Sequence, residues 1–289
     1  MKKLFTMFLI FVMLFAFSAA AMAEGEESTP ITLNWISARN AFSQAGITGS
    51  FYEIKDFGMD IWVPDILTPQ DEIPEDCYYV FTDENESVSV KVHYVGFEEE
   101  VTLQSLEKLI TDLGSESDGI FWINNYDALI YDTKAIDSTA VIIPFDSGNT
   151  LEFVFEPMSN PDFYSLASLI MSTIQPHQLS VVDVAMMIDA DLNSVWGPEK
   201  SVRYTDDENG TTLTVFLWEE GITSETIGNV NNWEAVREDK VLRYNNYVDI
   251  LNELGMGDTV LLTLMYISPE EDLSFLTITG GEITYDELG

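Results

Sequence analysis

Few residues in this chain have side chains suited to nucleophilic, general-base or metal-binding chemistry. The 289 residues include one cysteine, Cys77, and two histidines, His93 and His177. Two histidines exclude a multi-histidine metal site and leave little for general-base work near neutral pH. Cys77 starts a predicted strand, which favours a small buried hydrophobe over a nucleophile. His93 has the parity of the polar strand face and is expected in solvent, and His177 is expected in a linker.

The short signatures of common catalytic sites are missing. The sequence has no G-x-S-x-G, G-x-x-x-x-G-K-[ST], G-x-G-x-x-G or H-E-x-x-H. Paired carboxylates can hydrolyse glycosides, but among 50 acidic residues no single pair stands out. Residues 189–200 begin like a calcium loop, yet Ser194 replaces its glycine, Lys200 replaces its bidentate acid, and the spacing is helical. The sequence therefore designates no catalytic, cofactor-binding or metal-binding residue and implies no cofactor.

Acidic residues dominate the charge. The chain has 50 Asp and Glu against 12 Lys and Arg, a net charge of -38. Such a field repels nucleic acid and anionic membrane surfaces, which excludes both as partners. The partners that remain are an unknown protein or envelope ligand and non-specifically attracted cations.

The first 23 residues have the pattern of a signal peptide. Lys2 and Lys3 precede an apolar run over 4–17, and Ala21-Met22-Ala23 is a small-x-small cleavage box. Cleavage after Ala23 is expected to leave an acidic tail over 24–29 and a soluble, secreted bacterial protein that does not insert into the membrane. Loss of the two lysines takes the net charge from -38 to -40.

Residues 30–178 show strand and helix periodicities in turn. The clearest strand is 88–94, where apolar and polar residues alternate, and the turn-prone residues 83–86 join it to 78–82 as a hairpin. A strand is also predicted within 50–66, and hairpins over 121–132 and 140–156. Helices are predicted over 35–45, over 103–113, and from Pro161 until Pro176. One apolar strand face implies an antiparallel sheet with helices packed against it.

Residues 179–289 form a second, smaller α+β domain by the same criteria. Ser180 with Asp183 starts a helix, and a hairpin follows over 202–218. A long helix runs from about Trp233 to Gly255, and three strands are predicted over 260–267, 273–279 and 282–285. The periodicity restarts after 176–179, which places the domain boundary at residue 178.

The order of elements in the first domain resembles the PsbP-like family. The resemblance is carried by residues 57–64 (FGMDIWVP), 105–113, 123–131 (INNYDALIY) and 163–176 (FYSLASLIMSTIQP). It implies an α/β/α sandwich with an antiparallel sheet. Because the family shares a shape rather than a chemistry, the resemblance implies no functional residue.

These observations favour an exported, non-catalytic binding or accessory protein of the bacterial envelope or extracellular space. Two alternatives stay open, a secreted carboxylate-dependent hydrolase and a calcium-binding surface protein. The identity of the ligand and the oligomeric state are left open as well.

Overall fold

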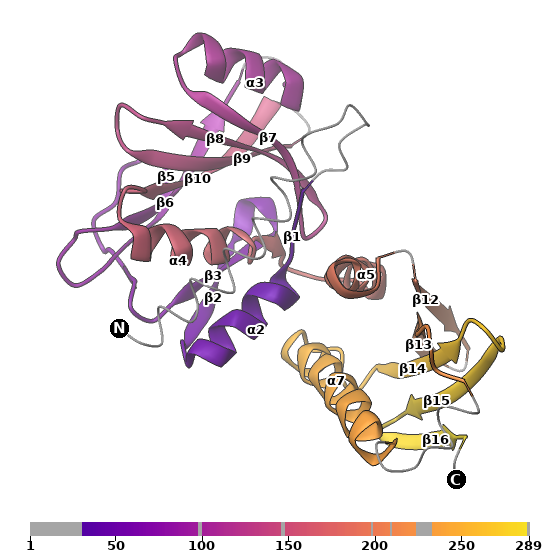
Figure 1. Ribbon diagram of the computed structural model, residues 1–289. Coiled ribbons are helices and arrows are strands. Elements are labelled where there is room, and N and C mark those ends of the chain that lie inside the picture. The colour runs from indigo at the N-terminus through magenta and orange to yellow at the C-terminus, as the bar shows by residue number, and fades with distance from the viewer. Residues whose placement is uncertain are drawn as a thin grey trace. The chain divides into compact units, whose positions relative to one another are not determined.

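The computed structural model describes residues 31–97, 100–145, 148–197, 199–208, 210–223 and 233–287. The chain forms two compact units, one ending at Gln178 and the other starting at Leu179 (Figure 1). Each unit combines helices with a mainly antiparallel sheet, which confirms the predicted α+β class. The predicted signal peptide and acidic tail lie outside the described residues. No helix in the described ranges is long and apolar enough to cross a membrane.

The first unit contains a large sheet in the order β1-β7-β8-β9-β10-β6-β5-β4. Its strands are β1 (Ile31–Leu33), β4 (Thr68–Pro69), β5 (Cys77–Thr82), β6 (Ser89–Gly96), β7 (Glu116–Ile123), β8 (Tyr126–Thr133), β9 (Ser138–Pro144) and β10 (Asn149–Glu156). Only β1 pairs in parallel, with β7. The three predicted hairpins are therefore present. Asn124 and Asn125 join β7 to β8 with φ of 40° and 81°, the left-handed backbone that a type I′ turn requires.

The strand predicted within 50–66 is in fact two strands of a separate small sheet. This sheet has the order β11-β3-β2, with β2 (Gly49–Ile54), β3 (Met59–Pro64) and β11 (Gln175–Pro176). A single 3-10 turn, η1 (Lys55–Phe57), joins β2 to β3. All six residues of β3 are buried, because it is the central strand and both of its faces are covered.

Three helices of the first unit begin at capping residues that the sequence shows. They are α2 (Trp35–Ala45), α3 (Leu103–Asp112) and α4 (Pro161–Met171), capped by Asn34, Thr102 and Asn160. Helix α3 packs Leu106 and Ile110 against Leu129 of β8 and Ile142 of β9. Leu113, the last residue of the helix predicted over 103–113, is 77% exposed because it follows the last turn of α3.

The two faces of the large sheet are covered unequally. Figure 1 shows α3 on one side of the sheet and α4 on the other. On the α4 side Leu151, Phe153 and Phe155 of β10 are fully buried, as are Val90 and Val92 of β6. On the opposite face α3 contacts β7 and β8 and packs on Ile142 of β9. The neighbouring strands β10, β6 and β5 carry polar residues there.

Within the residues that the structure describes, the second unit has a five-stranded sheet and two helices. Its strands run in chain order across the sheet: β12 (Lys200–Asp207), β13 (Gly210–Trp218), β14 (Val260–Ser268), β15 (Leu273–Thr279) and β16 (Glu282–Asp286). Helix α5 (Val181–Trp196) contacts β12 and β13, and α7 (Trp233–Glu253) contacts β14 and β15. The connection through α7 makes β13 and β14 parallel. Buried residues alternate along both strands, so one face forms the core.

The calcium-loop candidate, residues 189–200, begins inside helix α5, as its helical spacing predicts. Asp189 and Asp191 are residues of α5 rather than of a loop. Lys200 pairs with the Asp189 carboxylate, and the Tyr247 hydroxyl donates to Asp191 Oδ2 over 3.2 Å. These carboxylates are therefore engaged in packing α5 against β12 and α7.

Candidate functional site

A row of polar side chains lies on the sheet face that α3 leaves uncovered. We call it the open face, and it consists of Cys77, Ser89, Lys91, His93, Glu152 and Glu156. The register explains why they gather: His93 pairs with Glu152, and Ser89 pairs with Glu156, on adjacent strands. Residues that pair directly across a ladder point to the same face. The polar residues of the alternating 88–94 pattern therefore lie on a half-exposed surface.

A β-bulge places Cys77 on this face. Tyr79 pairs with Val92, so a regular ladder would set Cys77 opposite Tyr94. The ladder shifts between Cys77 and Tyr79, and Cys77 pairs with His93 instead. The extra residue is Tyr78, and bulges of this kind redirect side chains. Alternation along β5 gives no sign of this shift, which is why the sequence does not bring Cys77 and His93 together.

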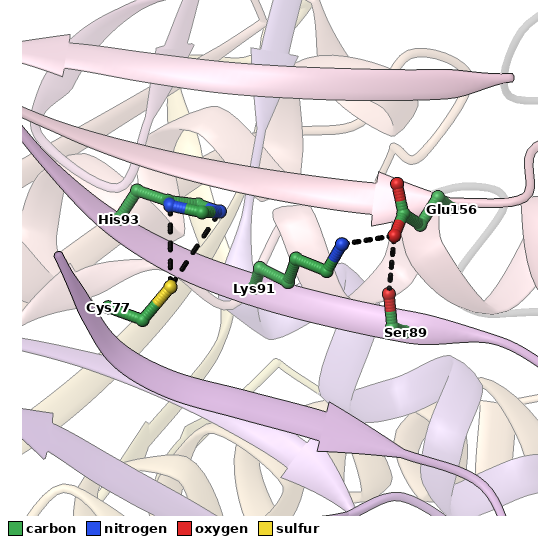
Figure 2. A network of polar contacts seen from close by, with 5 residues as sticks. All are labelled: Cys77, Ser89, Lys91, His93 and Glu156. Atoms are coloured by element: carbon green, nitrogen blue, oxygen red, sulfur yellow. Dashed lines mark hydrogen bonds and ion pairs between the residues drawn. The ribbon is translucent and has the colours of Figure 1, made fainter. Parts of the chain in front are cut away.

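Cys77, His93 and Asp76 form a cluster at the start of β5, and Figure 2 shows the first two of these residues. Cys77 Sγ lies 3.4 Å from His93 Nδ1 and 4.0 Å from its Nε2. His93 Nδ1 lies 3.7 Å from Asp76 Oδ2, and the His93 side chain is 22% exposed. Cys77 is buried, which confirms the prediction that it is a small buried residue. His93 lies on the polar face, as its parity predicts, but it is only partly exposed to solvent because the imidazole packs against the thiol.

Electrostatics keep the thiol protonated. Burial raises the pKa of Cys77 above its ordinary value, the Asp76 carboxylate raises it further, and the Lys91 ammonium opposes them. A nucleophilic cysteine needs the opposite environment, in which positive groups lower the thiol pKa. At neutral pH Cys77 is therefore a weak hydrogen-bonding group rather than a thiolate.

The three side chains do not have the geometry of a catalytic triad. In a triad one imidazole nitrogen faces the nucleophile, and the other nitrogen is held by the carboxylate. Here Nδ1 is the ring nitrogen nearest to Cys77 Sγ and is also the one paired with Asp76. At 3.7 Å the Asp76 carboxylate is beyond hydrogen-bonding distance of Nδ1, so it does not hold the imidazole in one tautomer as the acid of a triad does.

The rest of the open face is internally paired. Lys91 Nζ pairs with Glu156, whose Oε1 also accepts from Ser89 Oγ over 3.2 Å (Figure 2). The Tyr131 hydroxyl donates to Glu152, and burial followed by the Glu152 charge raises the pKa of that phenol. The face thus presents one amine, two carboxylates and an imidazole at fixed positions.

His177, predicted as a linker residue, has a structural role in the first unit. Its backbone N–H donates to Gly58 O over 2.8 Å, and its Nδ1 lies 2.9 Å from Asp60 Oδ1. Its Nε2 lies 3.6 Å from Glu53 Oε1. The hydrogen bond and charge of Asp60, aided by Glu53, raise the pKa of His177. The prediction is wrong because β11 carries the chain alongside β3 just before this residue.

A second acidic site lies at the other end of the large sheet. Asp118 in β7 neighbours Asp132 in β8, and the Asp132 carboxylate accepts from the Thr139 hydroxyl. Partial desolvation, with repulsion from Asp132 and Glu116, raises the pKa of Asp118 to about 6 although its residue surface is largely exposed. The sequence could not single out this pair among 50 acids.

No protein-family model and no curated protein sequence matches the chain. Among solved structures, cyanobacterial PsbP (CyanoP) from Synechocystis sp. PCC 6803 is 16% identical with a TM-score of 0.32, over 44% of this chain and 91% of that chain. The Saccharomyces cerevisiae Ran-binding protein Mog1p is 11% identical with a TM-score of 0.31, over 45% and 96%. A Bacteroides thetaiotaomicron VPI-5482 protein is 8% identical with a TM-score of 0.30, over 83% and 90%. These likenesses concern the fold alone.

Proposed function

We propose that the protein is an exported, non-catalytic binding protein of the bacterial envelope or extracellular space, with a PsbP-like first unit. Its open face is the binding surface. The signal-peptide pattern supports export, and the strand and helix order supports the PsbP-like assignment. The partner is a protein or envelope component that carries basic groups, because the mature charge of the chain is strongly negative.

One observation supports a binding role over a catalytic one. In His93 the ring nitrogen nearest to Cys77 Sγ is also the nitrogen nearest to Asp76, so no carboxylate orients the imidazole as a general base for the thiol. The cluster therefore offers hydrogen-bonding and ligand atoms on a half-exposed surface without an activated nucleophile. A flat, partly solvated sheet face with paired charges is suited to recognition, because rim charges steer a partner and set specificity.

Export is tested by N-terminal sequencing of the protein recovered from the culture medium or envelope. We expect the sequence to begin at Glu24. A product that begins at Met1 would contradict the proposed cleavage.

Binding is tested by capture from the source organism's envelope extract, with immobilised residues 24–289. Glu156→Gln removes a carboxylate of the open face that pairs with Lys91, and Glu116→Gln is the matched control because Glu116 pairs with Lys134 outside that face. We expect a captured component that the control retains and the Glu156 variant loses. A component retained equally by both variants would refute the open face as the binding surface.

The hydrolase alternative is supported by Asp118. A carboxyl group with a pKa near 6 beside a second carboxylate is the arrangement of a general acid and its partner. Hydrolysis of a panel of aryl glycosides that Asp118→Asn abolishes and Asp71→Asn preserves would favour this alternative. The binding role predicts no turnover by any of the three proteins.

A further inference from the structure

We propose that Asp76, Cys77 and His93 form a site for a thiophilic divalent metal ion such as Zn²⁺. The site goes beyond the proposed binding function and does not depend on export. It uses one sulfur, one nitrogen and one oxygen ligand from two paired strands. A solvent molecule or a group of a partner would complete the coordination.

The distances suit this ion. One ligand atom from each residue lies within 4.8 Å of the other two, with 3.4 Å between Cys77 Sγ and His93 Nδ1. Zinc lies about 2.0–2.3 Å from its ligands, so tetrahedral ligand atoms are about 3.3–3.8 Å apart. To reach these distances, the longest separation between two of the three ligand atoms has to shorten by at most about 1.5 Å.

The backbone holds two of the ligands in place before any ion binds. Asp76 O accepts from Tyr94 N over 2.9 Å, and Cys77 N donates to Pro74 O over 3.1 Å. The bulge then directs the thiol at the imidazole. Because Sγ is close to both ring nitrogens, it faces the ring, and a rotation of the His93 ring about χ2 would turn one nitrogen lone pair toward the ion.

Ligand type selects the ion. Thiolate and imidazole favour Zn²⁺ and related soft or borderline ions, whereas Ca²⁺ and Mg²⁺ require an all-oxygen shell. On binding, the metal replaces the thiol proton, and the thiolate and the Asp76 carboxylate balance its two positive charges. Nearby Lys91 opposes binding, but Glu156 pairs with its ammonium. Three protein ligands and one exposed position are the composition of open zinc sites.

The test is a Co²⁺ and Zn²⁺ titration of the reduced protein, residues 24–289, with millimolar Ca²⁺ present to saturate weak carboxylate sites. We expect one equivalent of Co²⁺ to produce a thiolate-to-cobalt charge-transfer band in the near ultraviolet. One equivalent of Zn²⁺ should remove that band. Absence of the band would overturn the proposal, because Cys77 is the only thiol.

Variants assign the ligands. We expect Cys77→Ser to abolish the band, and His93→Gln and Asp76→Asn to weaken Zn²⁺ binding about 100-fold and 10-fold, since losing a ligand costs at least as much as losing a supporting group. His177→Gln is the matched control, because it removes the other imidazole of the chain, which lies near two carboxylates but near no thiol. Equal weakening by His177→Gln would refute the assignment.

A measurement on the unmodified protein guards against variants that fail to fold. Stoichiometric Zn²⁺ should protect Cys77 from alkylation and raise the melting temperature by ligand linkage. Ca²⁺ at the same concentration should do neither. Unchanged alkylation at saturating Zn²⁺ would rule out Cys77 as a ligand, whatever the variants show.

Discussion

Asn124 is a buried hydrogen-bonding centre whose removal should cost the first unit much of its stability. Its side chain is fully buried and joins three segments that are distant in sequence. Asn124 Oδ1 accepts from Trp35 N over 2.8 Å, at the start of α2. Its Nδ2 donates to Ser172 O over 2.7 Å and to Ile174 O over 2.9 Å, after the end of α4.

The magnitude for Asn124→Ala follows from the groups left behind. One backbone N–H and two backbone carbonyls lose their partner, and each such buried group costs about 1–3 kcal/mol. Alanine at the left-handed φ of 40° adds about 1 kcal/mol. Water entering the vacated space would offset part of this sum. We therefore expect Asn124→Ala to lower the free energy of unfolding by about 4 kcal/mol, near the lower bound of this sum. The free energy of unfolding of a domain is about 5–15 kcal/mol, so this loss is a large part of it.

Hydrogen exchange measured by mass spectrometry on peptides of β7 and β8 reports the stability of this unit separately from the second. Asn124→Gly relieves the backbone strain but not the lost hydrogen bonds, so it should lose about 1 kcal/mol less than alanine. Asn85→Ala, at an exposed position of the β5–β6 turn, is the control and should change the stability by less than about 0.5 kcal/mol. A loss below about 1 kcal/mol for Asn124→Ala would refute the assigned role.

Three further predictions rest on the electrostatics. Iodoacetamide should alkylate metal-free Cys77 more slowly than free cysteine at neutral pH, because burial and the Asp76 carboxylate raise the pKa of the thiol above its ordinary value; a faster reaction would show an activated thiol. His177→Gln should lower the melting temperature most below about pH 6.5, where the ring is charged in the folded and unfolded states, and the effect should vanish as the pH rises through the raised folded pKa. A difference between wild type and variant that grows with pH would contradict that sign. Glu219→Gln should destabilise the second unit by about 3 kcal/mol, because it leaves the buried ammonium of Lys240 without its nearest carboxylate; urea unfolding followed on peptides of α7 and β14 measures this, and an unchanged midpoint would contradict it.

Local signals in the sequence account for most of the secondary structure. Asn34, Asn160 and the Ser180–Asp183 pair start three helices because their side chains bond backbone N–H groups within the first turn. The Asn124–Asn125 turn is equally local, since both residues tolerate positive φ. Such features depend on neighbours in sequence, and the sequence therefore predicts them.

Features that depend on distant partners could not be predicted in this way. The two-residue strands β4 and β11 show no periodicity and exist only because β5 and β3 pair with them. The sequence likewise shows Asn124 as a turn residue but not as a centre that contacts α2 and the end of α4. For the candidate site, alternation predicted the face of His93, while the bulge that brings Cys77 to it left no trace in the pattern.

The bulge at Tyr78 also bears on how this strand can change in length. Two successive tyrosines reach the same neighbouring segment, since the Tyr78 hydroxyl donates to Asp56 Oδ2 over 2.8 Å and the Tyr79 hydroxyl donates to Glu53 O over 2.9 Å. In a regular strand, inserting or deleting one residue exchanges the two faces of everything beyond it. Deleting Tyr78 would instead restore the regular ladder and leave Cys77 opposite His93. This strand therefore has one position at which evolution can add or remove a residue without exchanging solvent-facing and core-facing side chains.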